Sequence, residues 1–254
     1  MTWLRYDMDA APVHPSLYAS LARTARMTAG DVFFVHTPLG VRLRCRADRP
    51  DAADAAWQAA LSEARGRGWL IAWRPAPHEP EGFGGPDAMA AAHRVFTADS
   101  LAWLEFLARA DRPVPTVARW AASLLMIRSL VDGLGLPPWE TDDVWDRIAR
   151  RTRHAETAET ADPAVRHLTY ALRAGGDEPD ILRHRLDAHQ NALVAAYDVA
   201  VRPAAAAWRA TATPALRHGV ALAVLFHWNR AAMPVAHQHL LAGSRITRSF
   251  PVAA

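Results

Sequence analysis

Strand-like and helix-like patterns are unevenly distributed along this chain of 254 residues, and that distribution constrains the fold most strongly. Four short segments are apolar or alternate between apolar and polar residues, which is typical of strands. All four lie in the first third of the chain, at 2–6, 31–36, 40–46 and 69–73. From residue 87 onward the pattern is almost wholly helical. We therefore expect an α+β protein, with a small antiparallel sheet near the N-terminus and a mainly helical C-terminal part.

Apolar spacing and helix-ending residues divide the helical pattern into separate helices. These helices are expected at 15–27, 52–65, 87–95, 100–110, 113–134, 139–153, 162–174, 178–210, 213–232 and 234–244. Ser100 is a natural N-cap for the helix that follows it, and Pro203 is expected to kink or end helix 178–210. No connection is longer than the loop 75–86, so residues 1–254 are expected to form one continuous unit.

Composition excludes several classes of protein. Hydrophobic residues make up 51% of the chain and charged residues 22%, which predicts a packed core rather than disorder. The longest apolar run, Val220–Phe226, is far shorter than a membrane span requires, and no secretory signal is visible. We therefore expect a cytoplasmic protein that does not engage a membrane. The single cysteine, Cys45, excludes an intrachain disulfide and a cysteine-built zinc site.

All 29 basic residues are arginines, and the chain has no lysine. Codon usage in a GC-rich genome explains this bias, and so does a surface suited to bidentate recognition of anions. The net charge is only +3, so the basic pI does not by itself indicate a nucleic-acid-binding protein. The absence of lysine excludes Schiff-base chemistry through a lysine side chain.

Motifs for common cofactors are absent. The sequence has no phosphate-binding Walker loop, no dinucleotide-binding glycine pattern and no His-Glu-x-x-His pair. His237 and His239 are the closest pair of the 12 histidines, but positions two apart on a helix point away from each other. We therefore expect neither a metal nor a cofactor.

Two candidate sites lie in the first third of the chain. In strand 40–46 the arginines, including Arg42 and Arg44, alternate with apolar residues and share one face. This face is either solvated or forms the floor of a site that binds carboxylates or carbonyl groups. The loop 78–85 contains Glu81 and paired glycines, which allow the backbone to approach a ligand closely. An ordinary polar loop explains the same composition.

The third candidate site is the segment Phe226–Arg230, which follows a buried apolar helical run. It places His227, Asn229 and Arg230 where that helix becomes polar. Such a change is typical of a helix that faces a pocket, but a capped helix end explains it equally well. Spacing alone does not identify a reaction.

These segments resemble the signature of a known family. The matching segments, in chain order, are Phe33–Val35, Val41–Arg44, Glu79–Pro86, Met89–Ser100 and His227–Arg230. Their order and spacing are similar to those of the thiopeptide-type bacteriocin biosynthesis domain, which is also the small C-terminal domain of class I lantibiotic dehydratases. The resemblance covers nearly the whole chain. Its most specific parts are Phe-Gly-Gly at 83–85 and Ala-Asp-Ser at 98–100.

The resemblance implies one of two chemistries. Some members of the family eliminate glutamate from glutamylated Ser or Thr of a precursor peptide, leaving dehydroalanine or dehydrobutyrine. Stand-alone members join two dehydroalanines by a formal 4+2 aza-cycloaddition, then expel water and the leader peptide, which leaves a pyridine at the core of a macrocycle. Neither chemistry implies a metal or cofactor in this domain.

Departures from the family pattern favour the second chemistry. Eliminating members usually carry a further basic residue just before the His-x-Asn-Arg segment, where this chain has Leu225 and Phe226. They also tend to have Arg before the aromatic-Gly-Gly, where this chain has Gly82. Elimination needs a base for the α-proton and cations for the leaving glutamate. The sequence therefore predicts an enzyme, a pyridine synthase of thiopeptide antibiotic biosynthesis.

The resemblance also suggests roles for individual residues. His227, Tyr197, His189 and Asn229 are the catalytic candidates, and the substrate-binding candidates are Arg42, Arg44, Glu81, Gln190 and Arg230. Tyr197 lies seven residues after Gln190 and shares its helix face, although packing in a helical core explains Tyr197 as well. Exposure to solvent likewise explains His189.

The expected partners are a precursor peptide, with its leader and modified core, and components of a split dehydratase from the same pathway. Three alternatives remain open. The chain could be the glutamate-eliminating half of a split Ser/Thr dehydratase, or a non-catalytic scaffold that binds leader peptide. An RNA-binding role is less favoured, and it would show as salt-dependent binding of tRNA.

Overall fold

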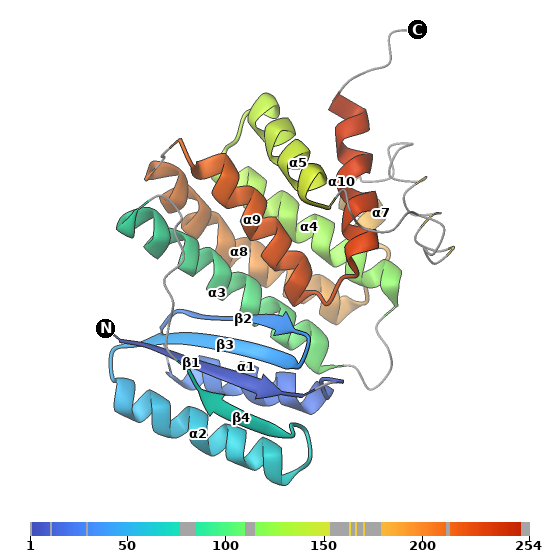
Figure 1. Ribbon diagram of the computed structural model, residues 1–254. Coiled ribbons are helices and arrows are strands. Elements are labelled where there is room, and N and C mark those ends of the chain that lie inside the picture. Colours follow the sequence, from blue (N-terminus) through green and yellow to red (C-terminus); the bar gives the residue numbers. More distant parts are fainter. Residues whose placement is uncertain are drawn as a thin grey trace, which may run out of the picture.

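The computed structural model of the chain describes residues 2–10, 12–28, 30–76, 85–109, 115–152, 163, 166, 170, 179–211 and 214–249 (Figure 1). For residues 246–249 it describes the backbone alone. It confirms the α+β class, with a small antiparallel sheet at the N-terminal end and helices in the rest. No helix within these ranges is both long and apolar enough to cross a lipid bilayer.

The sheet contains four strands in the order β2-β3-β1-β4, all antiparallel to their neighbours. The strands are β1 (Thr2–Asp9), β2 (Val32–Thr37), β3 (Gly40–Ala47) and β4 (Ala72–Pro75). The predicted hairpin is β2–β3. The fourth strand starts three residues later than expected, because the backbone N–H of Trp69 still donates to Ala64 O at the end of the preceding helix.

The two faces of the sheet differ in chemistry. Antiparallel register places Tyr6 opposite Leu43 and Arg5 opposite Arg44, so successive pairs alternate between faces. The face that contains Tyr6 is buried against α1 (Pro15–Thr28) and α2 (Pro50–Gly66), where Trp57 is fully buried. The opposite face carries the arginines of β1 and β3.

The remaining helices pack beyond the β2 edge of the sheet (Figure 1). They are α3 (Pro86–Ala108), α4 (Thr116–Leu134), α5 (Pro138–Thr152), α7 (Pro179–Arg183), α8 (Ala188–Ala210), α9 (Leu216–Arg230) and α10 (Val235–Ser249). Helices α3 and α4 both pack on α8. Gly133 permits the close approach of α4 to α8, because a Cβ there would lie 3.0 Å from the Cβ of Ala205.

Two expectations about the helix boundaries are wrong. Segments 87–95 and 100–110 form one helix, α3, and Ser100 lies inside it rather than capping it. Segment 178–210 is two helices, because the Asp187 side chain caps a new helix that starts at Ala188. Pro203 lies within α8 and does not end it. The expected helix 162–174 lies mostly outside the described residues.

Candidate functional site

Strand β2 forms one edge of the sheet, and hydroxyl groups of α3 bind its free N–H groups. Val32 N donates to the Oγ1 of Thr97 at 3.0 Å, and Phe34 N donates to the Oγ of Ser100 at 3.3 Å. An edge strand exposes such unpaired groups unless another element covers them. Thr97 and Ser100 therefore fasten the sheet to the helical part of the molecule.

Two side chains of α9 continue this attachment. Asn229 accepts from His36 N with its Oδ1 at 2.7 Å and donates to His36 O with its Nδ2 at 3.1 Å. Arg230 donates from its Nε to Phe34 O at 2.9 Å. The Asn229 amide thus makes the two hydrogen bonds that a neighbouring strand would make.

Asp99, on α3, binds two side chains of α9 through its carboxylate. Its Oδ1 lies 2.6 Å from His227 Nδ1, and its Oδ2 accepts from Arg230 Nη1 at 2.8 Å. Burial alone would raise the pKa of Asp99, but His227 and then Arg230 outweigh it and hold that pKa below its ordinary range. His227 is 3% exposed and Arg230 1%, so the Asp99 carboxylate compensates the charge of Arg230 inside the core.

The hydrogen-bonded chain continues beyond His227. Its Nε2 lies 2.9 Å from Ser123 Oγ, which accepts from Trp228 Nε1 at 3.1 Å. The order Ser123–His227–Asp99 matches that of a serine hydrolase. However, Ser123 is fully buried and does not line the cavity beside His227. Its hydroxyl is therefore out of reach of a substrate. The observable role of these hydrogen bonds is to hold α4 and α9 together.

Tyr197 reaches the same region from α8. It lines a cavity of about 10 Å³ together with Asp99, His227, Arg230 and Ile127. This volume is at the lower limit for one water molecule, so the cavity does not admit a peptide in this conformation. Burial raises the pKa of the Tyr197 hydroxyl well above its ordinary value. Three of the candidates predicted from sequence, Tyr197, His227 and Arg230, are thus brought together.

The polar end of α9 was expected either to face a pocket or to cap the helix. In the structure His227 and Arg230 turn into the core, where they line the small cavity, and Asn229 binds the sheet edge. Arg230 is only 1% exposed, so substrate contact there would require this part of the molecule to open.

The arginine face of the sheet is partly open. Asp7 pairs with Arg42 Nε at 2.8 Å and with Arg5 Nη2 at 2.9 Å, and Arg74 lies 4.0 Å away. Burial would raise the pKa of Asp7, but hydrogen bonds from Arg5 and Arg42 lower it below its ordinary value. Asp7, Arg42 and Arg74 also line a hollow of about 250 Å³ at this end of the sheet. Asp9 also lines this hollow, so with Arg5 beside Asp7 there are three guanidiniums to two carboxylates, a small positive excess that suits anions or carbonyl oxygens.

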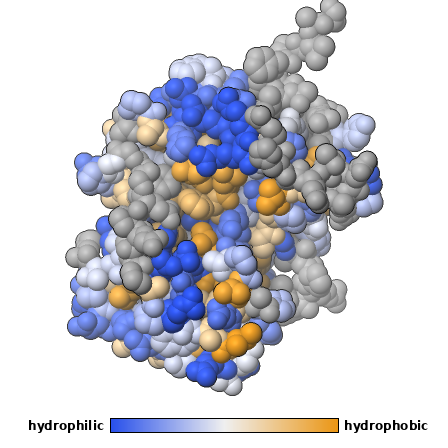
Figure 2. All heavy atoms as spheres, in the orientation of Figure 1, coloured by the Kyte–Doolittle hydropathy of each residue, from blue (hydrophilic) through white to orange (hydrophobic). Residues whose placement is uncertain are grey.

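Arg44 belongs to this face but is only 6% exposed. Its guanidinium lies 5.6 Å from the ring of Phe33. From there, ring contacts lead through Phe96 to Phe226, at 5.7 Å and 5.9 Å between centroids. Edge-to-face contacts between aromatic rings therefore fill the junction between the sheet and α9. In Figure 2 hydrophobic residues gather over α9, whereas hydrophilic and hydrophobic residues both appear over the strands.

The other candidates do not line the small cavity. Gln190 forms a capping box with Asp187 at the start of α8, where each side chain bonds to the other's backbone N–H. His189 lies beside it on the first turn of α8, and its Nε2 is buried without a hydrogen-bond partner among the described residues. Glu81 lies outside the described residues.

Sequence reasoning missed Arg5, Asp7, Asp99 and Ser123 as members of these sites. A sequence pattern could have identified the first two, because Arg5 and Asp7 alternate with Leu4, Tyr6 and Met8. That alternation predicts a longer strand with a charged face. Among the described residues, no group of three or more His, Cys, Asp or Glu side chains is arranged to hold a metal ion.

Comparisons with known proteins agree with this architecture. The structure of the tRNA-dependent lantibiotic dehydratase MibB from Microbispora sp. 107891 is similar, with a TM-score of 0.65 and 18% sequence identity. The match covers 97% of this chain but only 28% of MibB, so the chain spans under a third of that protein. No curated protein sequence matches the chain. The family model described as lantibiotic biosynthesis dehydratase C-term matches residues 11–245, and the chain therefore belongs to this family.

Proposed function

We propose that this protein is a pyridine synthase that acts on a modified precursor peptide. The formal 4+2 aza-cycloaddition joins two dehydroalanines, one of which reacts as the iminol tautomer of its amide. Loss of water and of the leader peptide as an amide then leaves the aromatic pyridine within a macrocycle. Members of the lantibiotic dehydratase family act on precursor peptides, which agrees with this choice of substrate.

The observation that carries the proposal is the apolar character of α9 just before His227. Leu225 and Phe226 stand where the resemblance to eliminating members implies a base. Both pack against the core, and Phe226 contacts the ring of Phe96. An apolar aromatic surface offers no base for an α-proton, whereas it suits the flat rings of an azole-containing peptide.

The arginine face supplies the polar part of the proposed site. Arg42 and Arg44 are proposed to bind carbonyl oxygens of the peptide, and Arg74 adds an exposed guanidinium beside them. Hydrogen-bond donors held at fixed positions stabilise charge that develops on carbonyl oxygens. Much of the remaining acceleration would come from holding the two ends of the peptide together.

Tyr197 and His227 stay the proposed proton-transfer groups, with His189 and Asn229 as further candidates. Because the first two are buried, the proposal requires the peptide to displace the side chains that cover them. Ile127 is such a side chain, since it lines both the small cavity and a larger hollow on the outside of α4.

A glutamate-eliminating activity is the second candidate. The observation in its favour is the excess of guanidiniums around Asp7, which would suit the carboxylates of a leaving glutamate. The same positive face would also allow a non-catalytic role in binding an acidic leader peptide.

Mass spectrometry of a single reaction separates these functions. The purified protein is incubated with a linear, azole-containing peptide that carries two dehydroalanines, without metal, nucleotide or tRNA. A pyridine synthase converts the peptide into a macrocycle and a free leader amide, so two new masses appear. Loss of glutamate from a glutamylated peptide without ring formation would identify an eliminase. Binding without any change of mass would identify a scaffold.

A further inference from the structure

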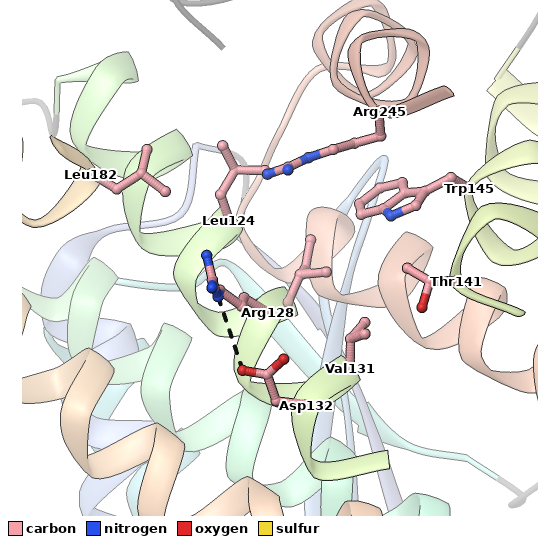
Figure 3. A pocket seen from close by; sticks show the side chains of 9 residues that line it. Leu124, Arg128, Val131, Asp132, Thr141, Trp145, Leu182 and Arg245 are labelled. Atoms are coloured by element: carbon pink, nitrogen blue, oxygen red, sulfur yellow. Dashed lines mark ion pairs between the residues drawn. The ribbon is translucent and has the colours of Figure 1, made fainter. Parts of the chain in front are cut away.

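We propose that a groove along the outer side of α4 binds an acidic peptide segment that carries a large apolar side chain. Two hollows form this groove, with volumes of about 230 Å³ and 170 Å³. They share Arg128 and Asp132 as lining residues. Figure 3 shows the larger hollow, with the Arg128–Asp132 pair on α4 and with Trp145 and Arg245 next to each other across from it.

The larger hollow has an apolar lining. Its apolar residues are Leu124, Ile127, Val131, Trp145 and Leu182, from three helices. The α4 residues Leu124, Ile127 and Val131 follow helical spacing and extend over about 10 Å of the helix. A hollow of this size lies below the range of about 300–1,000 Å³ that is typical of whole small-molecule ligands. It matches one large side chain or two smaller ones.

The smaller hollow has a positive lining. Arg128, Arg183 and Arg202 line it with two carboxylates, Asp132 and Asp198. Arg202 Nε already pairs with Asp198 at 2.8 Å, and its Nη2 lies 3.7 Å from Asp132. Arg183 is exposed at the end of α7. The three guanidiniums of this smaller hollow exceed its two carboxylates, and a partner with negative charge would balance the excess.

The pair that divides the two hollows is weak. Arg128 Nε lies 4.0 Å from Asp132 Oδ2, and both side chains are about half exposed, at 55% and 46%. Exposed ion pairs of this kind contribute little stability. A ligand carboxylate can therefore displace Asp132 from Arg128 at small cost, which would join the hollows into one continuous groove.

The lining favours a peptide over a nucleic acid. Single-stranded nucleic acids need exposed aromatic rings on which bases can stack. Trp145 is the aromatic residue of the groove and is only 7% exposed. A peptide segment can match both hollows. It would place an apolar side chain in the larger hollow and a carboxylate beside Arg128 and Arg183. The source of the segment rests on the proposed function: it would be a part of the precursor peptide other than the dehydroalanines that react.

The test selects ligands without using turnover, so its outcome is independent of the proposed function. A display library of random 12-residue peptides is selected on the purified 254-residue chain, and fluorescein-labelled copies of enriched peptides are measured by anisotropy. Val131→Trp and Thr141→Trp each fill the larger hollow from a different wall, and Arg183→Glu reverses a charge of the smaller one. Arg185→Glu makes the same charge change at an exposed residue that does not line the groove.

We expect enriched peptides to contain Asp or Glu beside a large apolar residue. Their dissociation constants should rise about tenfold or more with Arg183→Glu and with at least one folded filling variant, and change less than twofold with Arg185→Glu. Enrichment of basic peptides, an absence of binders, or equal affinity for all folded variants would overturn the proposal. So would full competition by a single-stranded oligonucleotide that binds Arg183→Glu as well as it binds the wild type.

Discussion

The side-chain amide of Asn229 binds the backbone of His36 as a neighbouring strand would, with Oδ1 2.7 Å from His36 N and Nδ2 3.1 Å from His36 O. His36 returns a third contact, since its Nδ1 lies 2.7 Å from Asn229 O. With Nδ1 donating to that carbonyl, Nε2 is left to accept from the hydroxyl of Tyr18 at 2.8 Å. One residue of α9 thus anchors the edge of the sheet over a sequence separation of 193 residues.

Asn229→Ala should destabilise the fold by about 1–3 kcal/mol, because it leaves two backbone groups of β2 without partners. For a chain of this size that corresponds to a lower melting temperature by about 2–4 °C per kcal/mol. Gln58→Ala removes an exposed amide that bonds to Asp54 and serves as the matched control. Thermal unfolding followed by circular dichroism measures both. Equal melting temperatures for the two variants would show that water replaces the Asn229 contacts.

Asp99→Asn should be the more damaging change, by about 3–5 kcal/mol, because it leaves Arg230 in the core without its carboxylate. Asp146→Asn, in an exposed ion pair with Arg150 on α5, is the control and should cost less than about 1 kcal/mol. Urea denaturation at neutral pH compares them. A cost for Asp99→Asn as small as that of the control would mean that the buried charges are not coupled.

The dependence of stability on acidic pH, compared between the wild type and Asp99→Asn, tests the lowered pKa of Asp99. The folded pKa of Asp99 lies below the ordinary value of about 3.9 for an aspartate. Its ionised form therefore stabilises the fold above that pH, and this contribution is lost as the pH falls through the lowered pKa. Between pH 5 and pH 2 the wild type should lose stability more steeply than Asp99→Asn. Parallel curves for the two proteins would contradict the lowered pKa.

Local patterns were sufficient to predict the sheet hairpin and most helices. The alternation of Val41, Leu43 and Cys45 with arginines is a property of the strand itself, and β3 has that form. Ser100 was misassigned because the preference of serine for N-caps is local, whereas its observed bond is to Phe34 N, 66 residues away. A tertiary contact therefore determines the environment of Ser100, and such a contact cannot be predicted from sequence spacing.

The candidate site was likewise only partly predictable from local sequence patterns. His227 and Arg230 were singled out because polar residues end an apolar run, but their partner Asp99 lies 128 residues from His227. Asp99 was part of a matching segment, yet nothing local showed that it would bind both residues. Burial of the network depends on the packing of α3, α4, α8 and α9, so the sequence could indicate the residues but not their exposure.

Arg42→Gln should weaken binding or turnover of the precursor, since it removes a guanidinium that is a third exposed beside Asp7. Arg44→Gln should act in the same direction, but Arg44 is buried against Phe33, so its folding is checked first. Added salt should weaken leader binding to the wild type, because exposed charges are screened. Arg65→Gln, on the exposed side of α2, is the control. Wild-type kinetics in Arg42→Gln would show that this face does not contact the peptide.

His227→Ala should lower turnover by about 10² or more, but it also removes bonds to Asp99 and Ser123 and therefore destabilises the fold. Tyr197→Phe separates these effects. The Tyr197 hydroxyl makes no hydrogen bond to the described residues, so its removal should leave the melting temperature nearly unchanged.

If Tyr197 transfers a proton in the proposed reaction, Tyr197→Phe should cut turnover by about 10² or more at unchanged stability. The affinity for the precursor should change far less, because the leader carries most of the binding. Mass spectrometry of single-turnover reactions measures the rate, and anisotropy with a labelled precursor measures the affinity. A folded Tyr197→Phe protein that turns over at the wild-type rate would remove Tyr197 from the reaction and leave it as a residue of the core between α8 and α9.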